Sequence, residues 1–141
     1  MVLNKYNFIS TRWGNYMKLN DATILVGDDS ILARKQLKDM ILSFGTPTFL
    51  DAKNGEEAVA LAIEKKPDLI FLDLVMPIKD GITAINEIKE SFADADIVVV
   101  SSVGTQTQLK NAITAGAKDF LQKPVKLALI KTIITSRFEG R

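Results

Sequence analysis

The stretch Pro67–Pro77, PDLIFLDLVMP, ends an uninterrupted apolar run with a carboxylate. The run, Leu69–Leu72, follows the basic pair Lys65 and Lys66, and such runs are typical of strands buried on both faces of a parallel sheet. Open α/β sheets carry their chemistry at the carboxyl ends of their strands. The stretch therefore predicts a central strand that places Asp73 at the functional rim of a sheet.

Strand and helix patterns alternate from Thr23 onward. The expected strands are Thr23–Gly27, Thr48–Ala52, Leu69–Asp73, Ile97–Ser101 and Asp119–Gln122. The expected helices cover about 30–44, 54–65, 82–92, 107–115 and 125–138, with Ser30 and an Asn54 to Glu57 capping box at two of their starts. Five consecutive strand–helix units predict an α/β fold, a doubly wound five-stranded parallel sheet in a single domain.

The composition excludes several kinds of chemistry. The 141 residues include no cysteine and no histidine, which removes thiol catalysis, disulfides, thiolate and imidazole ligands and the commonest general base. With 18 basic and 17 acidic residues the net charge is +1, so we expect no direct nucleic-acid binding. No apolar run approaches the length of a membrane span and no signal peptide is evident, so we expect no membrane association and a cytoplasmic location.

Residues 1–20 differ from the rest of the chain. They contain three basic and no acidic residues, and their aromatic residues follow neither a helical nor a strand period. These aromatic residues are Tyr6, Phe8, Trp13 and Tyr16. We expect an N-terminal extension over 1–20, either flexible or docked, and a functional domain over 21–141.

Polar residues stand at the carboxyl ends of the predicted strands, and these ends meet at one rim in a parallel sheet. They are Asp28, Asp29, Asp73, Ser101 and Lys123. Three converging carboxylates repel one another unless a cation neutralises them. Because the chain offers no nitrogen or sulfur ligands of this kind, the favoured cation is Mg²⁺, with Mn²⁺ or Ca²⁺ as alternatives. A carboxylate, a metal, an ammonium and a hydroxyl together suit a phosphoryl group.

Four of these features, in register on five strand–helix units, resemble the receiver domain of two-component response regulators, most closely the stand-alone chemotaxis CheY type. They are Asp28-Asp29, Asp73 in LDLVMP, Ser101 in VVVSS, and Lys123-Pro124 after GAKDFLQ. The resemblance covers about residues 22–138. It implies the strand order 2-1-3-4-5 and a cis peptide bond between Lys123 and Pro124.

The resemblance also implies a role for each residue at the rim. Asp73 would accept the phosphoryl group, and Lys123 would contact that group. Asp28 and Asp29, together with Asp73 and the backbone carbonyl of Val75, would hold Mg²⁺.

A switch is implied as well. Ser101 would be the switch hydroxyl that moves toward the phosphoryl group, and Phe120 would be an aromatic switch that turns inward behind it. Ser102 is the rival for the hydroxyl role, but neighbouring strand residues point to opposite faces, so only one of the two can face the cleft.

The chain departs from the family pattern in three places besides the N-terminal extension. Gly27 replaces the usual branched apolar residue before the acidic pair, which we expect to loosen the strand end. Val75 and Val103 stand two residues after the acceptor and the switch serine, at positions that tune hydrolysis in the family. Both are apolar here, which predicts a slow loss of the phosphoryl group.

The implied function is that of a phosphorylatable receiver. It would take a phosphoryl group from a histidine kinase or a phosphotransfer protein and change its surface to control a downstream target protein. Two alternatives stay open: a receiver cut from a longer regulator with an output domain after Arg141, and a pseudo-receiver that only docks partners. A phosphatase with an aspartyl nucleophile needs a second carboxylate where Val75 stands, so we expect a signalling switch and not an enzyme.

The last predicted helix shows two apolar sides. One stripe, expected to dock on the sheet, consists of Leu127, Ile130, Ile134 and Phe138. Leu129 and Ile133 are expected to point nearly the opposite way. We expect this second side to be covered either by a second copy of the domain, giving a homodimer, or by the aromatic extension.

Overall fold

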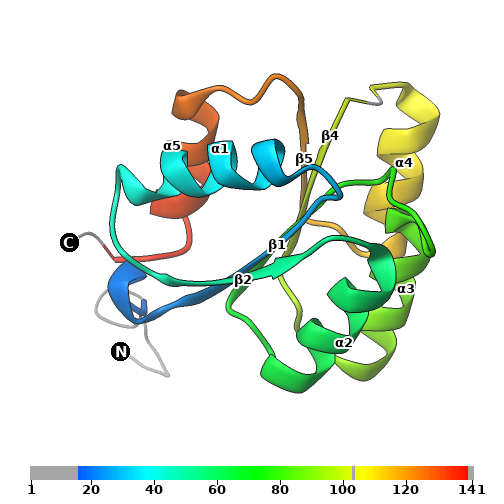
Figure 1. Cartoon of the computed structure of the whole chain (residues 1–141), viewed down its shortest axis with the longest axis horizontal. Helices are drawn as coiled ribbons and strands as arrows, with labels where there is room; N and C mark the ends of the chain where they lie inside the picture. Colours follow the sequence, from blue (N-terminus) through cyan, green and yellow to red (C-terminus); the bar gives the residue numbers. More distant parts are fainter. Residues whose placement is uncertain (1–15, 103, 140–141) are drawn as a thin grey trace.

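The computed structural model describes residues 16–102 and 104–139, which form a central sheet with helices on both faces (Figure 1). The strands in this part of the chain are β1 (Thr23–Gly27), β2 (Thr48–Ala52), β3 (Leu69–Leu72), β4 (Ile97–Ser101) and β5 (Asp119–Gln122). The helices are α1 (Ile31–Leu42), α2 (Gly55–Lys65), α3 (Gly81–Ser91), α4 (Gln106–Ala115) and α5 (Leu127–Thr135), preceded by the short 3-10 helix η1 (Leu19–Asp21). The strand order is β2-β1-β3-β4-β5 and every neighbouring pair is parallel. The predicted fold class and strand order are confirmed.

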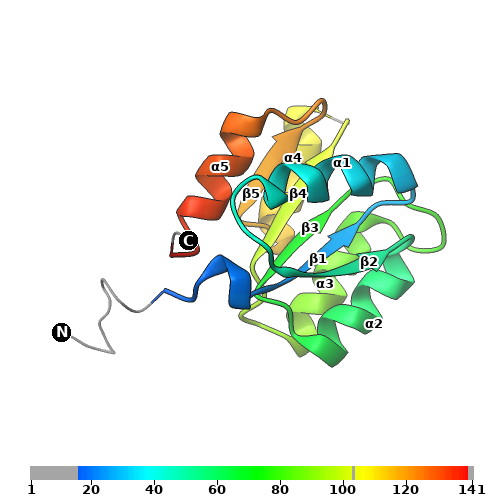
Figure 2. The same cartoon turned by 60° about the vertical axis from the view of Figure 1, so that its left-hand side comes forward.

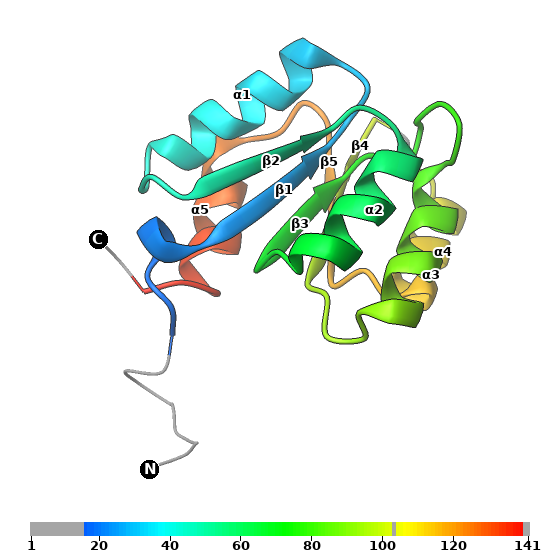
Figure 3. The ribbon, with the colours of Figure 1, turned by 60° about the horizontal axis from the view of Figure 1, so that its bottom comes forward.

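The sheet separates two apolar cores. Helices α1 and α5 cover one face of the sheet, and α2, α3 and α4 cover the other (Figures 2 and 3). Phe71 of β3 lies in the core beneath α1 and α5, whereas its neighbours Ile70 and Leu72 lie in the core beneath α2, α3 and α4. All four residues of β3 are buried, as its uninterrupted apolar sequence predicts. Among the described residues, no helix combines the length and the apolar character that crossing a bilayer requires.

The register of the sheet brings the ends of β1 and β3 side by side. Gly27, the last residue of β1, is aligned with Leu72, the last residue of β3. The residue that follows each strand is an aspartate, Asp28 in one case and Asp73 in the other. A Cβ added at Gly27 would lie 2.7 Å from Cδ1 of Leu72, so the Leu72 side chain occupies the space that a larger residue at position 27 would need.

Side-chain caps begin most of the helices. Ser30 and Asn54 accept backbone hydrogen bonds at the starts of α1 and α2, at 3.1 and 2.8 Å, as the sequence predicts. The carboxylate of Glu57 accepts a bond from the N–H of Lys53, one residue before Asn54, so only the return bond of the predicted capping box is displaced, by one residue. Asp80 and Thr105 cap α3 and α4 in the same way, and these two caps were not among the predictions.

The predicted orientation of α5 is wrong in two respects. Ile133 is 5% exposed and belongs to the core beneath α1 and α5, although it was expected on the outer side. Leu127 is 49% exposed, although it was expected to dock. The helix contacts α1 and shares a core with residues of the sheet, so its buried face is broad and centred on Ile130. Of the two residues predicted for the outer side of the helix, Leu129 alone is exposed, at 44%.

Part of the N-terminal extension packs against the domain. Leu19 is buried and lies in the core beneath α1 and α5, whereas Tyr16 is exposed. The backbone N–H of Glu139 donates a 2.9 Å hydrogen bond to the carbonyl of Met17, which joins the two ends of the described chain. Residues 1–15 of the extension, which include Trp13, lie outside the described residues.

Candidate functional site

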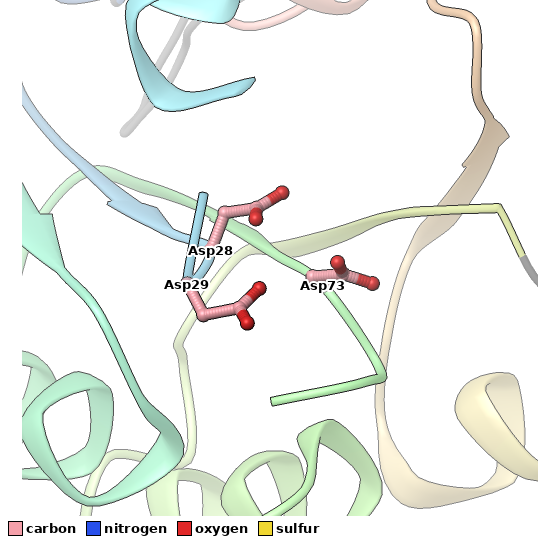
Figure 4. A group of neighbouring side chains, drawn as sticks. All are labelled: Asp28, Asp29 and Asp73. Atoms are coloured by element: carbon pink, nitrogen blue, oxygen red, sulfur yellow. The ribbon is translucent and has the colours of Figure 1, made fainter. Parts of the chain in front are cut away.

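Three carboxylates converge at the carboxyl ends of β1 and β3 (Figure 4). Asp28 and Asp29 follow β1, and Asp73 follows β3. One oxygen from each lies within 4.8 Å of the others. Asp28 and Asp73 are 6% and 7% exposed, whereas Asp29 is exposed to solvent. The structure thus brings together the three acidic residues that the sequence singles out.

Backbone hydrogen bonds fix the two buried carboxylates. The N–H of Asp28 donates to the carbonyl of Ala52, and the N–H of Asp73 donates to the carbonyl of Gly27, at 3.0 and 2.9 Å. One oxygen of each side chain then accepts a backbone N–H: Ser30 donates to Asp28 Oδ1, and Val75 donates to Asp73 Oδ1. Each aspartate is therefore oriented at its main chain and at its carboxylate.

Lys123 bridges the two buried carboxylates. Its Nζ donates to Oδ2 of Asp28 at 2.7 Å and to Oδ2 of Asp73 at 3.2 Å. Burial alone would lower the pKa of Lys123, but the hydrogen bond to Asp28 and the charge of Asp73 outweigh burial and raise that pKa above its ordinary value. The lysine therefore stays charged beside the acidic cluster. The peptide bond from Lys123 to Pro124 is cis, as predicted.

The predicted switch residues lie on β4 and β5. Ser101, the last residue of β4, is fully buried, and its neighbour Ser102 is exposed. Phe120 lies on β5 opposite Val99, half-buried against the core beneath α2, α3 and α4. Val103 lies outside the described residues.

The loop after β3 approaches the site closely. Val75 is 60% exposed, two residues after Asp73. At Gly81, the first residue of α3, a Cβ would overlap the carbonyl oxygen of Asp73. Only glycine allows the start of α3 to pack this closely behind the aspartate.

The acidic cluster fits a hard divalent cation. All three side chains offer oxygen ligands, which Mg²⁺, Mn²⁺ and Ca²⁺ prefer, and the 4.8 Å limit allows one ion to contact all three. A pocket of about 720 Å³ lies beside the cluster, between α1 and the segment that precedes α5, with Asp28 and Lys123 on its wall. Its other walls are mainly apolar, and Asp29 and Asp73 are not part of it. The candidate chemistry therefore belongs to the carboxylate cluster and not to the pocket.

One charged residue that contacts the site, Arg34, is not among the residues that the sequence singles out. Nη1 of Arg34, on α1, donates a 2.6 Å hydrogen bond to the backbone carbonyl of Asp28. Its Nε donates to the carboxylate of Asp51 on β2, which also binds Lys38. The sequence offers only a weak signal for this contact: Arg34 and Lys38 are four residues apart on the predicted helix, and Asp51 lies near the end of the next strand.

Comparisons with known proteins agree with this geometry. A family model described as the response regulator receiver domain matches residues 24–135. The chemotaxis proteins CheY of Bacillus subtilis (strain 168) and of Thermotoga maritima are each 44% identical to this chain over 101 residues, which span 72% of the chain and 84% of each relative.

Solved structures give the same result. A chain of the CheX-CheY-BeF3-Mg²⁺ complex from Borrelia burgdorferi aligns with a TM-score of 0.77 and 32% identity, covering 82% of this chain and 87% of that one. The receiver domain of the sensor histidine kinase PA1611 from Pseudomonas aeruginosa PAO1, which has a magnesium ion coordinated in its active-site cleft, aligns with a TM-score of 0.72 and 28% identity over 80% of this chain and 93% of that one. The family match, the identity to these relatives and the shared fold show that this chain belongs to the response regulator receiver domains and is CheY-like.

Proposed function

We propose that this protein is a phosphorylatable receiver that accepts a phosphoryl group on Asp73 and changes its surface to control a partner protein. The observation that carries the proposal is the pairing of Asp73 with Lys123. A carboxylate with 7% exposure is held next to a permanent ammonium and two further carboxylates, at the rim where parallel α/β sheets carry their chemistry. The donor in this proposal is a histidine kinase or a phosphotransfer protein, as the family membership implies; the chain itself has no histidine and so cannot be that donor.

In the proposed phosphoryl transfer, Asp73 is the residue of this chain that forms a covalent bond to phosphorus. A carboxylate oxygen of Asp73 attacks the phosphorus of a phosphohistidine and forms the new P–O bond. The P–N bond breaks, and the imidazole nitrogen leaves with the electron pair. Lys123 donates hydrogen bonds to the phosphoryl oxygens, where negative charge develops.

A divalent cation completes the site, with Mg²⁺ favoured over Mn²⁺ and Ca²⁺. Asp28, Asp29 and Asp73 would hold it, together with the backbone carbonyl of Val75. When bound, the ion neutralises the charge shared by the carboxylates and the incoming phosphoryl oxygens. The magnesium in the PA1611 receiver and in the CheX-CheY complex supports the choice of cation.

Two residues carry the signal outward. Ser101 stands at the end of β4, where its hydroxyl can bond a phosphoryl oxygen, and Phe120 on β5 then turns inward behind it. The output is a protein surface on the side of β4 and β5. The CheX-CheY complex shows a related protein meeting a protein partner.

A receiver within a longer regulator is the second candidate. The protein-glutamate methylesterase/protein-glutamine glutaminase of Caldanaerobacter subterraneus is 41% identical over 104 residues, and the match spans 28% of that protein. The same kind of domain is thus found as one part of a larger protein. In that case the partner of the proposed switch is an output domain in the same chain.

Incubation with acetyl phosphate and Mg²⁺, followed by intact-mass measurement, tests the proposal. We expect one phosphoryl group per chain in the wild type, none in Asp73→Asn, and none when EDTA replaces Mg²⁺. Asp94→Asn is the matched control, since Asp94 is exposed before β4 at the opposite edge of the sheet, and it should label like the wild type. Undiminished labelling of Asp73→Asn, or labelling in EDTA, would refute the site.

A further inference from the structure

Arg34 holds the peptide that joins the two neighbouring acidic residues. Its guanidinium, on a side chain only 13% exposed, donates from Nη1 to the carbonyl oxygen of Asp28 at 2.6 Å. That carbonyl belongs to the peptide group between Asp28 and Asp29. On the other side of the residue, the N–H of Asp28 donates to the carbonyl of Ala52 at 3.0 Å. The main chain of Asp28 is therefore held from both sides.

Asp51 fixes the direction of the guanidinium. Nε of Arg34 donates to Oδ2 of Asp51 at 2.9 Å, and Nζ of Lys38 contacts both oxygens of the same carboxylate at 2.9 Å. Burial opposes ionisation of Asp51, but the hydrogen bonds from Lys38 and Arg34 outweigh it and hold the pKa of Asp51 below its ordinary value. The acceptor thus stays charged, and Arg34 keeps one nitrogen on β2 and another on the turn after β1.

We propose that Arg34 is a positioning residue for divalent-cation binding by the Asp28–Asp29 pair. This rests on the proposed function of the acidic cluster as a cation site. Asp29 is exposed, so its direction toward the cluster depends on the peptide that precedes it. With the Asp28 carbonyl fixed by Arg34, that peptide plane cannot rotate, and both carboxylates stay directed toward Asp73. Groups that orient metal ligands in this way commonly contribute strongly to affinity.

The direction in which Mg²⁺ affinity changes when Arg34 is removed distinguishes a positioning role from a simple effect of charge. Arg34 is a cation close to a proposed cation site, so its charge alone repels Mg²⁺. If charge were its only influence, removal of Arg34 would tighten Mg²⁺ binding. Positioning predicts the opposite, because the ligands lose their arrangement.

Calorimetric titration of the unphosphorylated full chain with MgCl₂ tests the proposal. We expect Arg34→Gln to bind Mg²⁺ about 10-fold more weakly than the wild type, the lower end of the range for groups that orient metal ligands. Arg34→Lys keeps the charge but offers one nitrogen in place of two. We therefore expect its Mg²⁺ affinity to lie between those of the wild type and Arg34→Gln. Lys35→Gln is the matched control: it removes one positive charge from the same helix, at a side chain that is 67% exposed and paired with Asp39, and its affinity should stay at the wild-type value or rise slightly. Melting temperatures in EDTA identify any variant that is unfolded.

Several results would overturn the inference. Equal or tighter Mg²⁺ binding by Arg34→Gln would show that the arginine acts by charge or only stabilises the fold. Wild-type affinity in Arg34→Lys would show that the bridge of two nitrogens between Asp51 and the Asp28 carbonyl does not position the ligands, and this conservative variant decides the question if Arg34→Gln is unfolded. Absence of Mg²⁺ binding by the wild type would overturn the cation site itself, which distinguishes failure of the proposed function from failure of the role of Arg34.

Discussion

At the scale of single residues, Val75 sets the expected lifetime of the phosphorylated state. Its side chain is 60% exposed two residues after Asp73, and its isopropyl group can neither donate nor accept a hydrogen bond. Hydrolysis needs a water molecule held in line with the P–O bond, and Val75 offers nothing to orient it.

We predict that Val75→Asn shortens the lifetime of the phosphorylated protein several-fold, because an amide can orient that water. Loss of the phosphoryl group followed by mass spectrometry measures the rate. Val75→Ile, which leaves the side chain apolar, should keep the wild-type lifetime; equal lifetimes in all three proteins would contradict the mechanism.

At the scale of elements, α5 is held by the face that contains Ile130, Ile133 and Ile134, all buried beneath the helix. We predict that Ile133→Ala lowers the free energy of unfolding by about 2–5 kcal/mol, because it leaves a cavity between α5 and its neighbours. The partner variant Leu129→Ala changes a side chain that is 44% exposed and should stay within about 0.5 kcal/mol of the wild type. Urea denaturation followed by circular dichroism measures both. If Leu129→Ala proved the more destabilising of the two, a cover over the outer side of α5, such as a second copy of the domain, would be indicated instead.

At the scale of the whole molecule, the acidic cluster couples cation binding to folding. One oxygen from each of the three carboxylates lies within 4.8 Å of the others, and the ammonium of Lys123 contacts two of them, Asp28 and Asp73. The remaining repulsion opposes folding when no cation is present. A cation that binds only the folded chain adds about 2.7 kcal/mol to the free energy of unfolding at about 100 times its Kd.

We predict that Asp29→Asn melts at a higher temperature than the wild type in EDTA, and that Mg²⁺ raises its melting temperature by less. Thermal melts with and without Mg²⁺ measure both effects, and Asp94→Asn should behave like the wild type. An Asp29→Asn protein with a normal Mg²⁺ gain would exclude Asp29 as a ligand.

Local sequence patterns suffice to predict the helices, the strands and the place of the site. Strand identity follows from local apolar runs such as Leu69–Leu72, and helix starts follow from local caps such as Ser30 and Asn54. Parallel strands deliver their carboxyl ends to one rim, so the neighbourhood of Asp28 and Asp73 could be predicted before any contact was known. The strand order and the cis bond before Pro124 came from the resemblance to the family.

The tertiary structure alone decided the outer face of α5 and the contacts of Arg34. A helical period shows which residues share a side, but the width of the buried face depends on the neighbouring elements. Helix α5 contacts α1 and shares a core with residues of the sheet, and therefore Ile133 is buried. Arg34 can reach Asp28 and Asp51 together only because β2 pairs with β1 in one register beneath α1. Both outcomes depend on how the layers pack, which the local pattern of a sequence does not contain.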